Sequence, residues 1–354
     1  MDYIKGRGAQ HNTHNKFIQH QHEVLDDFLN YCEAENESAD NNKTTYLEIY
    51  PKTILNKVTS PDIGFSYSMN PYQGCEHGCI YCYARNTHEY WGYSAGLDFE
   101  RKILYKANAP ELLEKKLRSR NWQPQNIMFS GNTDCYQPIE KKLEITRKML
   151  QVLLKLKHPV SMITKNALIL RDLDVLREMA ALNLVRVSIS ITSLSEETRR
   201  IVEPRTATIK KRLETVKVLA ENNIPVNVMM APIIPSINSH EILPLVKKVS
   251  EQGATSVGYT IVRLNGAVGK IFTNWVRKTY PDRANKILHQ IEDTHKGSLN
   301  DSRYGNRMRG EGKIAEQIKT QFELARKLYL KDKKIPSLDF TKFDKHQTNQ
   351  ISLF

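Results

Sequence analysis

The chain has 354 residues, 40% of them hydrophobic, and its 52 Lys and Arg residues against 39 Asp and Glu residues give a formal net charge of +13. A mean hydropathy of −0.52 and the lack of any run near the roughly 18 apolar residues of a membrane helix exclude an integral membrane protein. Met1–Gln10 is polar and has no apolar core of the kind found in secretion signals, so we expect a cytoplasmic protein without membrane contact.

Residues 1–60 are expected to form a polar arm and linker. Lys5–Ala9 contains two glycines and predicts a flexible arm, and the polar segment Asn36–Lys43 predicts a solvated linker. Between them, Glu23–Tyr31 has the pattern of a short helix. The alternation in Tyr46–Tyr50 predicts a strand that leads into the next domain.

Three of the five cysteines, Cys75, Cys79 and Cys82, lie within eight residues of one another. Structural zinc takes four ligands, and an ordinary cubane iron–sulfur cluster takes one cysteine per iron. Three thiolates therefore suggest a cluster with one iron left open for a small molecule. A zinc site that adds His77 or His88 is the alternative. Disulfides are disfavoured because the cysteine count is odd and the spacing is too short for unstrained pairing.

From residue 61 to residue 275 the sequence alternates between apolar runs of strand length and amphipathic segments of helix length. The predicted strands are Asn126–Ser130, Val160–Thr164, Val185–Ile191, Val226–Ala231 and Ser256–Arg263. The predicted helices are Pro110–Arg120 with Asn108 as its N-cap, Lys142–Lys155, Leu173–Leu182, Ser195–Ile201, Thr208–Asn222 and His240–Gln252. This alternation is typical of parallel βαβ units. About six such units predict an α/β fold, a partial barrel open on one side.

Functional groups in barrels of parallel strands gather at the carboxyl ends of the strands. Four predicted strands lead into polar, glycine-containing or proline-containing segments, which are Gly131–Pro138, Thr164–Asn166, Ser188–Ser193 and Ala231–Pro235. We therefore expect the contacts to a cofactor to lie where these segments meet.

Residues 276–354 are expected to form a basic, mainly helical extension, with seventeen Lys and Arg residues against ten Asp and Glu residues. A basic balance favours polyanionic partners such as DNA or RNA. Within it, Arg303–Gly310 combines three arginines with a tyrosine and two glycines, a mixture suited to phosphate contacts and base stacking. The same segment could instead fold over the open side of the barrel as a lid. Ile314–Leu330 predicts a helix that docks onto the core.

The cysteine loop, with Tyr81 directly before its third cysteine, resembles the C-x3-C-x-aromatic-C signature of radical S-adenosylmethionine (SAM) enzymes. The resemblance implies that Cys75, Cys79 and Cys82 hold a 4Fe–4S cluster whose open iron binds SAM. It also implies that Tyr81 lies near the adenine, although packing beneath the loop is an alternative. Radical SAM enzymes share a (β/α)6 partial TIM barrel, which agrees with the fold expected above.

The same resemblance implies further cofactor-binding residues on two strands. The residues that replace the family's Gly-Gly-Glu segment, which holds the SAM amino group, are Gly131, Asn132, Thr133 and Asp134. This sequence lacks the Gly-Gly-Glu itself, so the roles of these four residues stay open. Ser190 and Thr192 occupy positions that commonly contact the SAM carboxylate or ribose.

Longer segments resemble those of uncharacterised bacterial radical SAM proteins related to spore photoproduct lyase. These segments are Gly6–Ala9, Met69–Cys75, Thr133–Glu140, Glu203–Arg205 and Gly305–Gly310. The resemblance runs from the N-terminal arm to about residue 330. It is most specific in the cysteine loop and in the Thr-Asp-x-Tyr-Gln-Pro segment.

Cys135 follows the end of a predicted strand, near the place where a substrate radical would form. Spore photoproduct lyase uses a cysteine near the equivalent strand end to quench its product radical. The resemblance therefore implies a catalytic role for Cys135 as a hydrogen-atom donor. A small buried packing residue is the alternative, because most free cysteines are of that kind.

The sequence as a whole predicts a radical SAM enzyme with one 4Fe–4S cluster, acting on a damaged DNA pyrimidine or a modified RNA base. A peptide, a protein or a small metabolite is the alternative substrate, and a zinc-bearing nucleic-acid-binding protein is the alternative of another class. We expect a monomer that contacts nucleic acid through its basic C-terminal segment and takes electrons from a donor such as flavodoxin or ferredoxin.

Overall fold

The computed structural model describes residues 3–17 and 43–346. The predicted helix Glu23–Tyr31 lies outside these residues, as does all of the predicted linker except Lys43. No helix in the described part of the chain is both long and apolar enough to span a bilayer.

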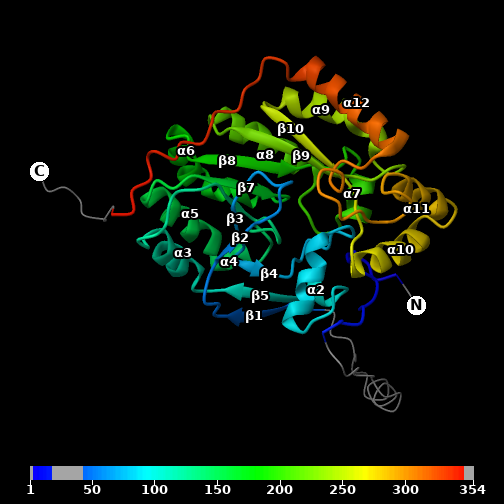
Figure 1. The fold of residues 1–354 in the computed structure, drawn as a ribbon, viewed down its shortest axis with the longest axis horizontal. Helices are drawn as coiled ribbons and strands as arrows, with labels where there is room; N and C mark the ends of the chain where they lie inside the picture. The colour runs from blue at the N-terminus through cyan, green and yellow to red at the C-terminus, as the bar shows by residue number, and fades with distance from the viewer. Residues whose placement is uncertain (1–2, 18–42, 347–354) are drawn as a thin grey trace, which may run out of the picture.

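A seven-stranded sheet forms the centre of the molecule (Figure 1), with the strand order β10-β9-β8-β7-β6-β3-β2. Its strands are β2 (Leu55–Lys57), β3 (Tyr67–Met69), β6 (Ile127–Phe129), β7 (Val160–Thr164), β8 (Val185–Ser190), β9 (Val226–Ile233) and β10 (Ser256–Ile261). Six strands, from β3 to β10, run parallel, and β2 pairs antiparallel with β3 at one edge. The fold is therefore the partial (β/α)6 barrel that the alternation predicts.

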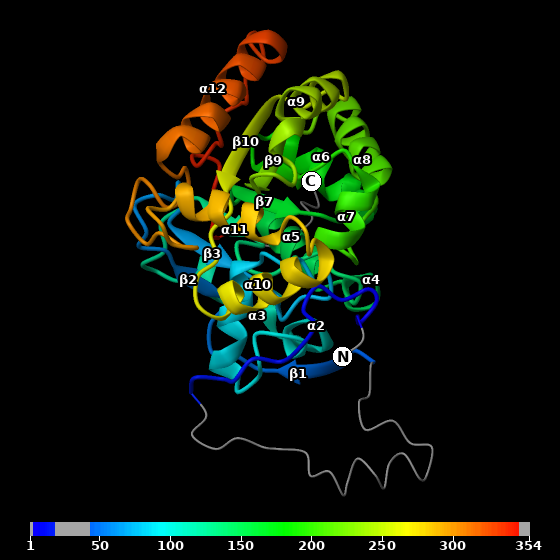
Figure 2. The ribbon, with the colours of Figure 1, turned by 90° about the vertical axis from the view of Figure 1, so that its right-hand side faces the viewer.

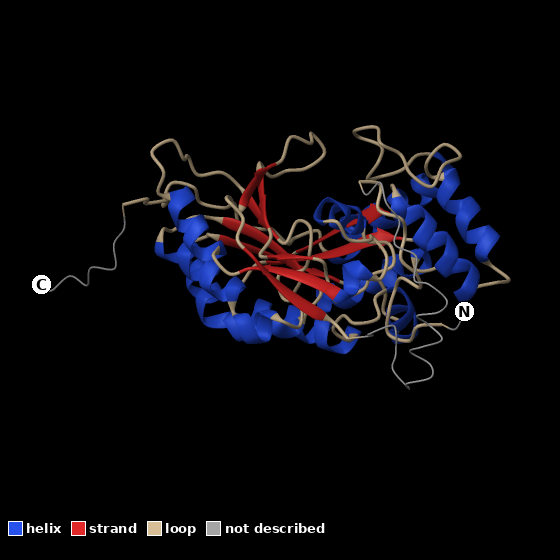
Figure 3. Cartoon of the chain, turned by 90° about the horizontal axis from the view of Figure 1, so that it is seen from below, coloured by secondary structure: helices blue, strands red, loops and turns tan. Residues whose placement is uncertain are grey.

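Helices follow the parallel strands and line the outer side of the sheet (Figure 3). They are α3 (Ala109–Leu117), α4 (Glu140–Leu143), α5 (Ile145–Lys155), α6 (Leu173–Ala181), α7 (Glu196–Val202), α8 (Ile209–Glu221) and α9 (Ile242–Glu251). The side chains of Ser195 and Thr208 accept backbone N–H bonds at the starts of α7 and α8, which explains why these helices begin where the sequence indicates. Asn108 occupies the N-cap position of α3 without a side-chain cap bond.

Two of the predicted elements differ from the structure. The helix predicted over Lys142–Lys155 is divided, because Glu144 adopts a left-handed conformation with φ of 54° between α4 and α5. The strand predicted at Tyr46–Tyr50 forms as β1 (Thr45–Ile49), but it does not lead into the barrel. It pairs with β5 (Lys102–Lys106) in a separate three-stranded sheet whose third strand is β4 (Tyr72–Gln73).

The segment Lys5–Ala9 is docked against the domain, so the prediction of a flexible arm is wrong. The backbone N–H groups of Gly8 and Ala9 donate to the Glu100 carboxylate at 3.2 and 2.8 Å. Glu100 lies in α2 (Asp98–Arg101) and is fully buried with Arg85, whose guanidinium pairs with it at 2.5 Å. The arm supplies donors that a buried carboxylate requires, a need that its own composition does not reveal.

Replacing Gly8 with alanine is expected to release this arm. A Cβ at Gly8 would lie 1.8 Å from the carbonyl oxygen of Gly78, which is backbone and cannot turn aside. We expect the free energy of unfolding to fall by about 1–3 kcal/mol and limited proteolysis near the N-terminus to accelerate. Gly64→Ala is the matched control, because a Cβ there meets nothing within 4 Å. Equal proteolysis of both variants would contradict the docking of the arm.

The C-terminal part contributes α10 (Ala267–Thr279), α11 (Ala284–Asp293) and α12 (Gly312–Tyr329). As predicted, a helix near Ile314–Leu330 docks onto the core, since α12 lies beside α9 and β10 (Figure 2).

The segment Arg303–Gly310 closes the open side of the barrel, in agreement with the lid interpretation. The N–H of Ile261 at the end of β10 donates to the Met308 carbonyl at 2.9 Å. Arg307 pairs with Asp62 at 2.5 Å, and Arg309 donates to the Tyr259 carbonyl at 3.1 Å. These two guanidiniums therefore hold the lid in place.

Candidate active site

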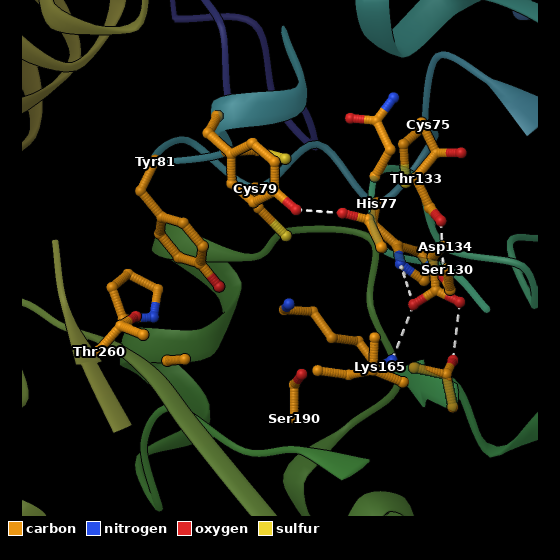
Figure 4. A pocket seen from close by; sticks show the side chains of 18 of the residues that line it. Cys75, His77, Cys79, Tyr81, Ser130, Thr133, Asp134, Lys165, Ser190 and Thr260 are labelled. Carbon is orange, nitrogen blue, oxygen red and sulfur yellow. Dashed lines mark hydrogen bonds and ion pairs between the residues drawn. The ribbon is translucent and has the colours of Figure 1, made fainter. Parts of the chain in front are cut away.

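One cavity of about 380 Å³ lies at the carboxyl ends of the parallel strands, and the cysteine loop forms part of its wall (Figure 4). Of the predicted site residues, those that line it are Cys75, Tyr81, Cys79, Cys82, Gly131, Asn132, Thr133, Asp134 and Ser190. Residues from the loop, β6 and β8 therefore meet in one place, as the rule for parallel strands predicts.

The cysteine loop is shaped by two glycines in the left-handed region. Gly74 and Gly78 have φ of 78° and 65°, which side chains with a Cβ rarely adopt. The loop is fixed to the domain by a 2.8 Å bond from the Cys75 N–H to the Phe99 carbonyl. Burial raises the pKa of the Cys79 thiol to about 12, so the thiol keeps its proton at neutral pH in the absence of a metal. Metal binding displaces that proton and leaves the thiolate as the ligand.

The donor set of this loop fits an iron–sulfur cluster with one open iron. Three free thiols line the cavity, and the fourth free cysteine in the described part of the chain, Cys135, does not. Soft thiolates are the ligands of such clusters. No three His, Cys, Asp or Glu side chains among residues 3–17 and 43–346 are arranged to hold a single metal ion.

Of the two histidines of the zinc alternative, His77 lines the cavity and His88 does not. His77 places Nδ1 3.3 Å from the Asp134 carboxylate and Nε2 3.5 Å from the Asn166 amide. His88 is buried against the rings of Tyr93 and Phe99. His77 is therefore engaged by Asp134 and Asn166, and His88 lies outside the cavity that the three thiols line.

Asp134 connects the end of β6 to the cysteine loop and to β7. Its carboxylate accepts bonds from the Thr164 hydroxyl at 2.7 Å and from the Lys165 N–H at 2.8 Å, and it faces His77 (Figure 4). Burial alone would raise the pKa of Asp134, but His77 and these two donors lower it to about 2. Asp134 therefore acts as a charged anchor between three segments of the wall.

The charged form of Asp134 is expected to make stability depend on acid pH. The pKa of Asp134 in the folded protein lies below its unfolded value of about 3.9. The charged carboxylate therefore makes its full contribution to the free energy of unfolding above that pH, and this contribution is lost as the pH falls toward 2. In urea unfolding of the cluster-free protein, the stability advantage of wild type over Asp134→Asn should shrink by about 2 kcal/mol between pH 5 and pH 2.

The control for this titration is Asp332→Asn, since Asp332 is exposed and has no ion pair among the described side chains. Its stability difference from wild type should not change over the same pH range. An advantage over Asp134→Asn that stays constant down to pH 2 would show that Asp134 is not held in its charged form.

Tyr81 is anchored by a buried carboxylate that the sequence does not indicate. Its hydroxyl donates to Glu203, which lies 122 positions further along the chain and pairs with Arg212 at 2.7 Å. Glu203 and Arg212 are both fully buried. Thr192, predicted to contact SAM, does not line the cavity and donates its hydroxyl to Glu203 at 3.1 Å. The structure therefore favours a supporting role for Thr192 behind the cavity wall.

Cys135, the predicted hydrogen-atom donor, is fully buried in the main hydrophobic core. Its N–H donates to the Ser130 hydroxyl at 2.9 Å. Because the side chain does not line the cavity, the structure favours the packing role for Cys135 over the donor role.

The cavity residues outside the predicted site set include Lys165, Tyr83 and Arg263. Lys165 directs its ammonium into the cavity (Figure 4), 5.9 Å from the centroid of the Tyr81 ring. Tyr83 donates its hydroxyl to the Gly131 carbonyl, and Arg263 follows β10. Lys165 and Arg263 lie at the ends of predicted strands, so the strand-end rule already contained the signal for both.

Comparison with known protein families and sequences agrees with this geometry. A family described as the radical SAM superfamily matches residues 69–249, about half of the chain. The uncharacterised protein Rv2578c of Mycobacterium tuberculosis is 31% identical over 241 residues, which cover 67% of this chain and 71% of that protein. The uncharacterised protein MJ0683 of Methanocaldococcus jannaschii is 28% identical over 243 residues, 68% of this chain and 86% of that one.

Among solved structures, spore photoproduct lyase complexed with dinucleoside spore photoproduct is similar with a TM-score of 0.60. The two sequences are 16% identical, and the match covers 82% of this chain and 81% of the lyase. At this identity the likeness establishes the fold. In this chain, that fold places the cysteine loop at the carboxyl ends of the parallel strands.

Proposed function

The chain belongs to the radical SAM superfamily, whose cofactors are a 4Fe–4S cluster and SAM, and we propose that this radical SAM enzyme acts on a nucleic-acid base. The observation that carries the proposal is that three thiols and the polar ends of the strands line one cavity. When bound, the reduced cluster and SAM supply a carbon-centred radical that removes a hydrogen atom from a substrate.

The residues of this chain have separate roles in the proposed site. Cys75, Cys79 and Cys82 hold the cluster. The remaining residues proposed to orient SAM beside it are Tyr81, Gly131, Asn132, Thr133, Asp134, Lys165 and Ser190. Burial opposes the positive charge of Lys165, but the nearby Cys79 and Glu203 outweigh this effect and raise its pKa. An ammonium group in this place suits a carboxylate such as that of SAM. The apolar walls exclude water from the reacting groups.

Two observations support a nucleic-acid substrate. The chain carries a net charge of +13, which favours polyanions, and the lyase with the same fold binds a dinucleoside photoproduct. Because Arg307 and Arg309 are engaged within the lid, contacts to phosphates further along a strand would come from other cations of the C-terminal part.

The enzyme class is tested by anaerobic reconstitution with iron and sulfide. We expect a brown protein that forms 5′-deoxyadenosine from SAM when dithionite is added. A colourless protein that retains zinc and leaves SAM intact would contradict the proposal.

The substrate class is tested with deuterium-labelled candidates, namely irradiated single-stranded DNA, an RNA pool and a peptide pool. Deuterium should appear in 5′-deoxyadenosine when a labelled nucleic acid is present. Label that comes only from the peptide pool would instead identify a peptide-modifying enzyme.

A further inference from the structure

Arg263 is a cavity residue that forms no hydrogen bond or ion pair with a carboxylate among the described residues. It follows β10, lines the cavity and is half-buried. Burial lowers the pKa of Arg263 and the neighbouring positive charge of Arg307 lowers it further, while Tyr83 and Asp62 act in the opposite direction. A partly desolvated cation beside another cation is unfavourable in the absence of an anion.

Asp62, the carboxylate that acts on Arg263, is bonded to the lid. Asp62 accepts bonds from the Arg307 Nε at 2.5 Å and from the Gly305 N–H at 2.7 Å. Arg307 also donates to the hydroxyl of Ser60. The lid therefore takes the hydrogen bonds of the Asp62 carboxylate, and Arg263, which lines the cavity, forms no ion pair with it.

The cavity wall near Arg263 is apolar. The loop before β3 and the lid supply it through Val58, Ile63, Phe65 and Met308. The other cation of the cavity, Lys165, has a different environment, since Cys79, Glu203 and Asp134 are among the charges that act on it. The two cations thus serve two regions, one beside the cysteine loop and one beside the loop before β3.

We propose that Arg263 is the subsite for a phosphate group of the substrate and that the adjoining apolar wall receives the base. The planar guanidinium offers two parallel donors to the oxygens of a phosphodiester. This inference rests on the proposed function, and it adds the residue that would distinguish a nucleotide from a free nucleoside.

The test measures binding to the reconstituted holoenzyme in the presence of SAM by titration calorimetry. The probes are the dinucleotides d(TpT) and UpU and the nucleosides thymidine and uridine. At least one dinucleotide should bind at least tenfold more tightly than its nucleoside. Arg263→Gln should lose this advantage without changing nucleoside affinity, and Arg263→Lys should retain only part of it.

The matched control is Arg200→Gln, which removes one positive charge from a side chain that is 73% exposed on α7, and it should bind like wild type. Equal binding of dinucleotides and nucleosides, no binding of any probe, or unchanged dinucleotide binding by Arg263→Gln would overturn the inference. So would a loss of SAM affinity in Arg263→Gln, which would assign this arginine to the cofactor. Formation of 5′-deoxyadenosine by the wild-type holoenzyme, measured separately, tells such a failure apart from failure of the proposed function.

Discussion

Replacing Cys79 with alanine is expected to abolish cluster assembly and SAM cleavage. The loop offers three thiols to the cavity, and no other cysteine in the described residues lines it, so no substitute ligand is at hand. A cluster bound through three protein thiolates depends on each of them. Iron content after anaerobic reconstitution should fall from about four per chain to near background, and 5′-deoxyadenosine formation should fall below detection. Cys75→Ala and Cys82→Ala should behave in the same way.

Cys135→Ala is the matched control for these variants. Because Cys135 is buried in the core and does not line the cavity, the variant should keep its iron and its SAM cleavage and lose only about 1 kcal/mol of stability. It should also leave the product unchanged, since the geometry favours packing over hydrogen-atom donation. An altered product with intact SAM cleavage would restore the donor role. Full iron content in Cys79→Ala would remove this thiol from the cluster.

The parts of the fold that depend on local patterns could be predicted from the sequence. The strand predicted at Val160–Thr164 has the bounds that β7 has, because Val160, Met162 and Ile163 mark a short buried strand. The cysteine loop is evident in the sequence because its three ligands lie within eight residues of one another. The sequence also indicates Asp134 and Ser190, because the positions of strand ends follow from the predicted strands.

The parts that depend on contacts between distant segments could not be predicted. The N-terminal arm looks flexible in isolation, and it is ordered by Glu100, some 90 residues away in the sequence. Arg307 reaches Asp62 across 245 positions, and Glu203 reaches Tyr81 across 122. Each of these contacts satisfies a buried or partly buried charge. A single sequence shows which charges are present, but it does not show which of them burial forces to pair.

Removal of the Glu203 carboxylate is expected to be the most destabilising single change near the site. Burial opposes the charge of Glu203, but Arg212 and then Lys165 act against this and lower its pKa to about 2. Glu203→Ala leaves the Arg212 guanidinium buried without a counter-ion, which costs about 3–5 kcal/mol. It also frees the Tyr81 hydroxyl. Urea unfolding should show the loss of stability, and SAM affinity should fall at least tenfold if Tyr81 orients the cofactor.

Two comparison variants separate the stability effect from the positioning effect. Glu221→Ala breaks the exposed pair with Lys217 on α8 and should change stability by less than about 0.5 kcal/mol. Tyr81→Phe keeps the ion pair between Glu203 and Arg212 but removes the hydroxyl, so it should weaken SAM binding with a smaller loss of stability. If Glu203→Ala unfolds at the same urea concentration as Glu221→Ala, the buried pair of Glu203 and Arg212 does not stabilise the fold. If Tyr81→Phe binds SAM like wild type, the bond from Tyr81 to Glu203 stabilises the fold without orienting the cofactor.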